Sequence, residues 1–134
     1  MGSQQILLVV VGVVIVGVMI AVGLFMFRDQ AAATARDSIS NDLVALATGS
    51  QKYYRRPSTF GGGGNSFGGL TMSKLTTRGS NANGDYALSP DPVPPGTTMI
   101  TITGTGLETG NDGSTPVKLT MTVMADSILL VMNN

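Results

Sequence analysis

The chain has 134 residues, enough for one modest globular domain beside a long apolar block near the N-terminus. Eight Lys and Arg residues balance eight Asp and Glu residues, and only 12% of the chain is charged, so the composition predicts no nucleic-acid partner. Because the chain contains no Cys and no His, a disulfide framework, the usual zinc and copper sites, and catalytic triads built on those side chains are excluded.

Residues 1–27 are dominated by an apolar block that begins at Ile6 and contains no charged residue, Asn, Gln, Ser, Thr or Pro. As a helix, the 22 residues of this block reach roughly 33 Å, enough to cross the hydrocarbon core of a bilayer. A cleaved signal peptide is a poorer interpretation, because its apolar core spans only about 7–15 residues and follows a basic segment. The block therefore predicts a membrane helix.

Small residues interrupt the Val, Ile and Leu surface of this helix at Gly12, Gly17, Ala21 and Gly23. Small side chains let helix backbones approach closely in lipid, where no hydrophobic force drives association. Glycine is also frequent in membrane helices without any special role. We expect these four positions to pack against other helices.

Residues 28–56 are expected to continue the helix as an amphipathic half. Apolar side chains recur there at steps of three and four residues, with one longer gap, at Ala32, Ala35, Ile39, Leu43, Leu46 and Tyr53. The helix should end by Arg56, since the residue before a proline avoids the α conformation, or at Gly49 if that glycine is a stop. We expect Ile39, Leu43, Leu46 and Tyr53 to pack on the sheet predicted below or on neighbouring subunits.

Residues 57–69, PSTFGGGGNSFGG, form a glycine-rich connector. A phosphate-binding loop would need a strand before it and Gly-Lys-Ser/Thr at the start of a helix, and neither is present. We interpret the segment as an irregular surface loop that Phe60 and Phe67 attach to the domain.

Residues 70–134 show a period of two and predict a β-rich domain. Candidate strands lie at 70–77, 86–88, 97–103, 116–124 and 128–132. The clearest strand, 116–124, should turn Val117, Leu119, Met121 and Val123 inward. The apolar run 128–132 suits a strand covered on both faces. The last three strands should form an antiparallel meander packed on the amphipathic helix, because so small a sheet cannot bury its core alone. The predicted fold class is α+β.

This arrangement resembles the type IV pilins and their relatives, the pseudopilins and archaeal-type pilins. The sharpest motif is MGSQQILLVVVGVVIVGVMIAVGLFMF, which looks like a mature pilin N-terminus. The resemblance implies a structural major pilin that forms a homopolymer, an extracellular pilus used in adhesion or motility. It also implies an inner-membrane stage before assembly, a prepilin peptidase and a pilus assembly machinery as partners, and no cofactor.

Within this resemblance, Met1, Gln4 and Gln5 are the expected N-terminal contact between neighbouring subunits. Bacterial pilins typically carry Glu at the fifth position, paired with a neighbour's terminal amine. An ion pair at about 4 Å gains roughly 4 kcal/mol at an effective dielectric of about 20, whereas a hydrogen bond to one charged group nets about 1.5–3 kcal/mol. Gln5 should therefore select the register more weakly, and helix packing should contribute more.

Two further departures concern proline and processing. Bacterial pilins often have a proline within the apolar helix, whereas the first proline here is Pro57, so we expect a continuous helix and a divergent or archaeal-like branch. No basic leader precedes Met1, so we expect processed numbering or a very short leader; cleavage after Gly2 is the alternative.

Other functions stay open. A pseudopilin or minor pilin of a secretion or uptake machine would share the fold, and a single-pass anchored binding module would never polymerise. An enzyme is not expected, because no acid–base pair emerges, and no catalytic, cofactor-binding or metal-ligating residue is predicted. Asp91, Asp112 and Asp126 are too scattered to predict a calcium site.

Overall fold

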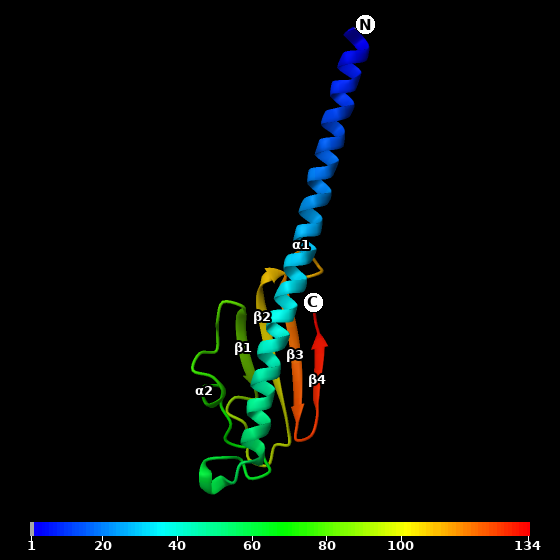
Figure 1. Cartoon of the computed structure of the whole chain (residues 1–134). Helices are drawn as coiled ribbons and strands as arrows, with labels where there is room; N and C mark the ends of the chain where they lie inside the picture. Colours follow the sequence, from blue (N-terminus) through cyan, green and yellow to red (C-terminus); the bar gives the residue numbers. More distant parts are fainter. Residues whose placement is uncertain (1) are drawn as a thin grey trace. The chain divides into compact units, whose positions relative to one another are not determined.

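The computed structural model describes residues 2–134 and has the predicted α+β fold (Figure 1). Contacts divide the chain into two compact units, the first extending to Ala31 and the second comprising Ala32–Asn134. The elements, in chain order, are α1 (Gly2–Arg55), the 3₁₀ turn η1 (Ser58–Phe60), α2 (Met72–Leu75), β1 (Gly84–Ser89), β2 (Met99–Thr109), β3 (Pro116–Met124) and β4 (Ile128–Met132).

Helix α1 runs without interruption through both predicted halves and ends at Arg55, two residues before Pro57. Gly49 lies inside the helix and does not end it. The glycine-rich connector instead folds back to satisfy the last carbonyl groups of the helix: the N–H of Gly63 donates to Tyr53 (2.8 Å), and that of Asn65 donates to Tyr54 (2.8 Å). The connector is therefore an ordered C-terminal cap, which unpaired helix carbonyls require.

The four strands form one antiparallel sheet in the order β1-β2-β3-β4, so the predicted meander of the last three strands is confirmed and β1 extends it. Figure 1 shows residues 32–55 of α1 across one face of this sheet, with β1 and β4 at opposite edges. Inward residues of β3 are buried as predicted, and Ile100 and Ile102 of β2 lie beside them in the core.

The helix approaches the sheet closely at Gly104 and Gly106 of β2. A Cβ atom added at Gly104 would lie 2.5 Å from Cγ2 of Ile39, and one added at Gly106 would lie 2.7 Å from Cδ1 of Ile39. Glycine within a strand commonly marks such an approach. These two positions let the helix side chain fill the centre of the core, where Ile39 is fully buried.

Three sequence predictions are wrong. Residues 70–77 form no strand: Leu70 is buried, its carbonyl accepts from the N–H of Val93 (3.0 Å), and the chain then turns into α2. Phe60 does not attach the connector, because it is 76% exposed, whereas Phe67 is fully buried and packs against Tyr54 with ring centroids 4.8 Å apart and the rings tilted by 47°. β4 is not covered on both faces, since all five of its residues are exposed.

Candidate functional site

The apolar half of α1 is the most exposed hydrophobic surface of the described chain. Its large apolar side chains, from Ile6 to Phe27, are each between 46% and 73% exposed. Among residues 2–134, α1 is the helix long and apolar enough to cross a membrane. Stable soluble proteins rarely expose so large an apolar surface to water, so this segment needs lipid or another protein around it.

The small residues of this segment are fully open, and they occupy two faces of the helix. Cβ atoms added at Gly12, Gly17 or Gly23 would meet no other atom within 4 Å. At about 100° per residue, Gly12 and Gly23 fall within roughly 20° of each other, while Gly17 and Ala21 lie on the opposite side. The four predicted packing positions therefore lie on two faces of the helix and not on one stripe.

Gln4 and Gln5 lie exposed in the first turns of α1, and no acidic residue occurs in its first turn. Met1, the third residue of the predicted N-terminal contact, lies outside the described residues. A helix N-terminus carries a partial positive charge, which favours acceptors such as amide oxygens close to it. Both glutamines present uncharged acceptors and donors at this end of the helix.

The amphipathic half of α1 packs as the spacing predicts. Ile39, Leu43 and Leu46 are buried in the core, and Tyr53 is half-buried with its hydroxyl donating to the carbonyl of Gly68 (2.8 Å). The longer gap in the apolar pattern contains Ser50, which is fully buried. Its hydroxyl donates to the carbonyl of Leu46 (2.9 Å), so this polar group is not left without a partner. A serine whose hydroxyl is bonded to its own helix can lie in an apolar stripe. The apolar spacing did not identify Ser50 as a core residue because serine is polar.

A polar cluster that the sequence did not predict joins α1 to the loop before β1; we call Asp42, Asn81, Asn83 and Tyr86 the Asp42 cluster. One oxygen of Asp42 accepts from the side-chain amides of Asn81 (3.0 Å) and Asn83 (2.9 Å) and from the Tyr86 hydroxyl (2.5 Å). The composition of residues 80–85 predicts a turn but not the side chain that holds it.

Protonation follows from these contacts. Partial burial raises the pKa of the Asp42 carboxyl, but the hydrogen bonds from Asn83, Tyr86 and Asn81 outweigh burial, so the pKa lies below its ordinary value. Burial and the neighbouring Asp42 charge raise the pKa of the Tyr86 hydroxyl well above its ordinary value. Near neutral pH the cluster therefore pairs a carboxylate with a protonated phenol.

Strand β4 forms a second exposed apolar surface. Its five side chains, Ile128 to Met132, are between 37% and 65% exposed, although the adjoining β3 residues Met121 and Val123 are buried. Helix α1 makes hydrogen bonds near the two ends of β4, where Arg36 donates to the carbonyl of Asn134 (3.4 Å) and Gln51 donates to that of Met124 (3.1 Å). Within its own unit β4 is therefore only partly covered, least at Met132 and Leu129.

The apolar half of α1 and strand β4 can bury apolar area against a partner, and the Asp42 cluster provides hydrogen-bonding groups. Within residues 2–134, no group of three or more His, Cys, Asp or Glu side chains is placed to hold a metal ion. A shallow cavity of about 250 Å³ lies beside the Asp42 cluster and is lined in part by Leu75 and Arg78.

The architecture is pilin-like: a long N-terminal helix, apolar in its first half, whose second half packs on a small antiparallel sheet. Comparisons with protein-family models, curated proteins and solved structures find no match to this chain.

Proposed function

We propose that this chain is the structural major subunit of an extracellular, type IV pilus-like helical filament. The observation that carries the proposal is the apolar half of α1, Ile6–Phe27, in which no large side chain is covered. In the membrane, lipid covers this surface. Outside the membrane, the same segments of neighbouring copies would cover one another along the filament axis.

The positions of the small residues support packing on more than one side. Gly12 and Gly23 would admit one neighbouring helix, and Gly17 and Ala21 would admit another on the opposite face. A helix in the centre of a bundle has neighbours all around it, whereas a simple pair of membrane helices needs one close face. Gln5 would then accept a hydrogen bond from a neighbouring terminus, and the assembly partners would be a prepilin peptidase and a pilus assembly machinery.

Imaging of cells that carry substitutions at Gly17 tests the proposal. Gly17→Leu adds bulk where close approach is required, and we expect at least a tenfold loss of surface filaments, equivalent to about 1.4 kcal/mol. Gly17→Ala is the matched control, because it changes the same position and keeps it small, and filament number should stay near that of the parent. Normal filaments from Gly17→Leu cells would contradict helix packing as the means of assembly.

The membrane-spanning length of the apolar segment also suits a single-pass anchored module that never polymerises. Removal of detergent from the purified chain separates the two functions, since a filament subunit should form fibres and an anchored module should not. A pseudopilin or minor pilin would share the assembly surface, but it would form a small fraction of sheared surface protein where a major subunit would dominate.

A further inference from the structure

The two edges of the sheet are finished differently. Beside β1, residues 79–81 run as a cover: the N–H of Tyr86 donates to the carbonyl of Gly79 (2.7 Å), and the N–H of Asn81 donates to that of Gly84 (2.9 Å). β4 has no such neighbour, and it contains no charge, proline, glycine or bulge. Natural proteins usually protect an exposed edge strand with one of these features, so an unprotected apolar edge indicates a contact surface.

The backbone of β4 also has unused groups. The N–H of Asn133 donates to the carbonyl of Lys118, and the carbonyl of Ser127 accepts from Met124, each at 2.9 Å. Successive residues of a strand direct their backbone groups to alternate sides. Residues 127 and 133 direct their backbone groups to β3, so the backbone N–H and C=O groups of Ile128, Leu130 and Met132 face the free edge.

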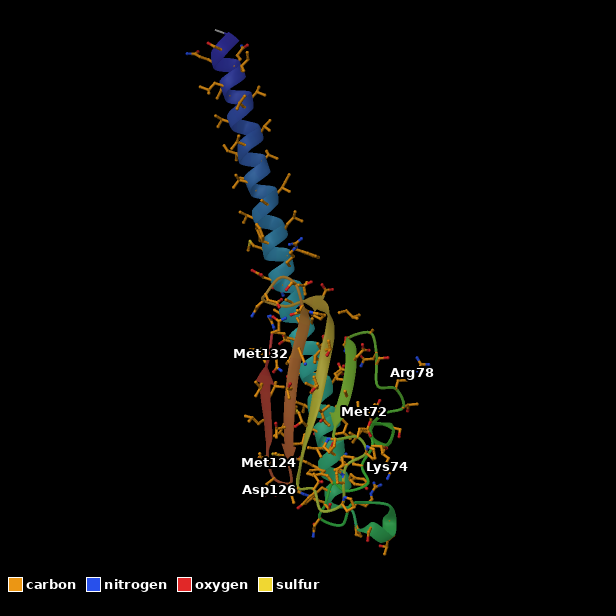
Figure 2. The ribbon with its side chains drawn as sticks, turned by 180° about the vertical axis from the view of Figure 1, so that it is seen from behind. Met72, Lys74, Arg78, Met124, Asp126 and Met132 are labelled. Atoms are coloured by element: carbon orange, nitrogen blue, oxygen red, sulfur yellow. The ribbon has the colours of Figure 1, made fainter. Side chains whose placement is uncertain are left out.

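We name residues 124–132 the β4 edge and residues 72–80 the α2 flank. They lie at opposite edges of the sheet, and Figure 2 shows Met124, Asp126 and Met132 at one edge and Met72, Lys74 and Arg78 beyond the other. The β4 edge contains one acidic residue and no basic residue, whereas the α2 flank contains two basic residues and no acidic residue. The two surfaces are thus complementary in charge.

The size of the β4 edge favours another protein chain as its cover. Its side chains expose on the order of 500 Å² of apolar surface, at the upper end of the largest patches found on monomers and somewhat below the ~800 Å² that each partner gives to a standard interface. A contact of this size is weak alone. It becomes effective when a second interaction, here the apolar half of α1, already holds the copies together.

We infer that the β4 edge of one copy docks on the α2 flank of a second copy, in a head-to-tail contact that repeats from subunit to subunit. The inference rests on the proposed function, because a heterologous contact generates rings or helical filaments. Pairing of β4 with a second β4 would also cover the edge. In its antiparallel form, that pairing would reverse α1 in one copy, which subunits inserted in one membrane with one orientation do not allow. In its parallel form, it would place the like charges of the two Asp126 side chains beside each other, whereas the α2 flank offers basic residues.

Engineered cysteines test this contact directly, because residues 1–134 contain no cysteine. Met132→Cys is combined with Met72→Cys or with Arg78→Cys, and membranes and sheared surface material are oxidised and run on non-reducing gels. Disulfides form only when Cα atoms approach within about 7 Å. We expect a ladder of multimers at least tenfold stronger than in the control pair Leu107→Cys with Met72→Cys, since Leu107 is as exposed as Met132 but lies on β2.

The outcomes separate this inference from the proposed function. Filaments that form normally while no pair of cysteines gives a ladder would overturn the head-to-tail contact and leave the filament proposal intact. A dimer from the single Met132→Cys variant would overturn it in favour of β4–β4 pairing. A ladder in membranes from cells without filaments would support the contact and contradict the filament function.

Reversal of charge adds a second readout. Asp126→Lys should reduce the cross-linked ladder severalfold, and adding Arg78→Glu should restore it. Lys74 is left unchanged, because its ammonium already donates to the carbonyl of Gly69 (2.8 Å). The combined variant is needed beside the single one, because Arg55 donates to the carbonyl of Ala125 (3.3 Å) in the same turn and Asp126→Lys would place a second cation near it. Failure of the combined variant to restore the ladder would contradict the proposed pairing of charges.

Discussion

Asp42 connects the loop before β1 to α1 through a single carboxylate oxygen. Three donors converge on that oxygen from Asn81, Asn83 and Tyr86, and the closest of them is the hydroxyl of a tyrosine whose ring is buried in the core. Hydrogen bonds to a charged group contribute about 1.5–3 kcal/mol, more than neutral bonds. One side chain thus holds a loop that has no regular secondary structure.

Asp42→Asn should lower the free energy of unfolding by about 1–3 kcal/mol, because the amide removes the charge on which the three donors converge. In a domain of this size each kcal/mol lowers Tm by roughly 4–8 °C. Thermal unfolding of the detergent-solubilised chain, followed by near-ultraviolet tyrosine signals, measures the shift. Asp37→Asn is the matched control, since Asp37 lies exposed on the same helix and should change Tm little.

The same variant predicts a pH dependence. Because the pKa of Asp42 is lowered in the folded chain, its contribution is fully present above the unfolded pKa of about 3.9 and is lost as the pH falls through the folded value. The difference in stability between the parent and Asp42→Asn should therefore be constant near neutral pH and shrink below about pH 4. A difference that stays constant down to pH 2 would contradict the role given to the carboxylate.

Gly106→Ala tests the close approach between α1 and β2. Its new Cβ would lie 2.7 Å from Cδ1 of Ile39, and overpacking of this kind typically costs about 1–3 kcal/mol. Ile39→Val removes that Cδ1 atom and alone should cost about 0.5–1.5 kcal/mol. The double variant should be more stable than the sum of the single effects indicates, by about 0.5 kcal/mol or more in a double-mutant cycle. Simple additivity would show that the two residues do not meet.

The long helix α1 contains one glycine, Gly49, within the half that packs on the sheet. A Cβ atom added there would lie 3.6 Å from Cδ2 of Leu75, an ordinary van der Waals contact. Gly49→Ala should therefore raise the free energy of unfolding by about 0.5–1 kcal/mol, because glycine weakens a helix interior relative to alanine. Gly61→Ala is the control with the opposite sign: Gly61 has φ +80° and open space around it, so alanine should cost roughly 1–2 kcal/mol. Thermal unfolding of both variants checks the pair.

Elements whose neighbours are close in sequence, or whose pattern is strong, were predictable. Pro57 marks the end of α1, the apolar spacing identifies Ile39, Leu43 and Leu46 as core residues, and β3 alternates as a half-buried strand should. These signals are local, and the structure keeps them because packing agrees with the local preference.

Other features depend on partners distant in the chain. β4 carries the composition of a strand covered on both faces, yet it lies at the edge of the sheet, and composition alone does not give strand order. The Asp42 cluster joins residues about forty positions apart, which no spacing rule detects. Residues 70–77 alternate like a strand, but the buried Leu70 turns the chain toward Val93.

Two large apolar surfaces are exposed among residues 2–134, and they differ greatly in size. The apolar half of α1 presents large side chains on every side of 22 residues, whereas the β4 edge presents a single strand. At about 25 cal/mol per Å², burial of on the order of 500 Å² gains roughly 12 kcal/mol. Association itself costs about 4–15 kcal/mol, so the β4 edge alone should hold copies together only weakly.

A chain that begins at Ala32, the start of the second compact unit, should therefore fold and remain monomeric at micromolar concentration, because it retains the β4 edge but loses the apolar helix. The full chain should form fibres when detergent is removed at the same concentration. Size-exclusion chromatography with light scattering measures the first result, and electron microscopy the second. Fibres from the shortened chain would show that the sheet domain carries assembly. If neither chain assembles, the apolar helix serves as an anchor. If the shortened chain is monomeric while the full chain forms fibres, helix packing is the main source of the free energy of assembly. The β4 edge then selects which neighbour a subunit contacts.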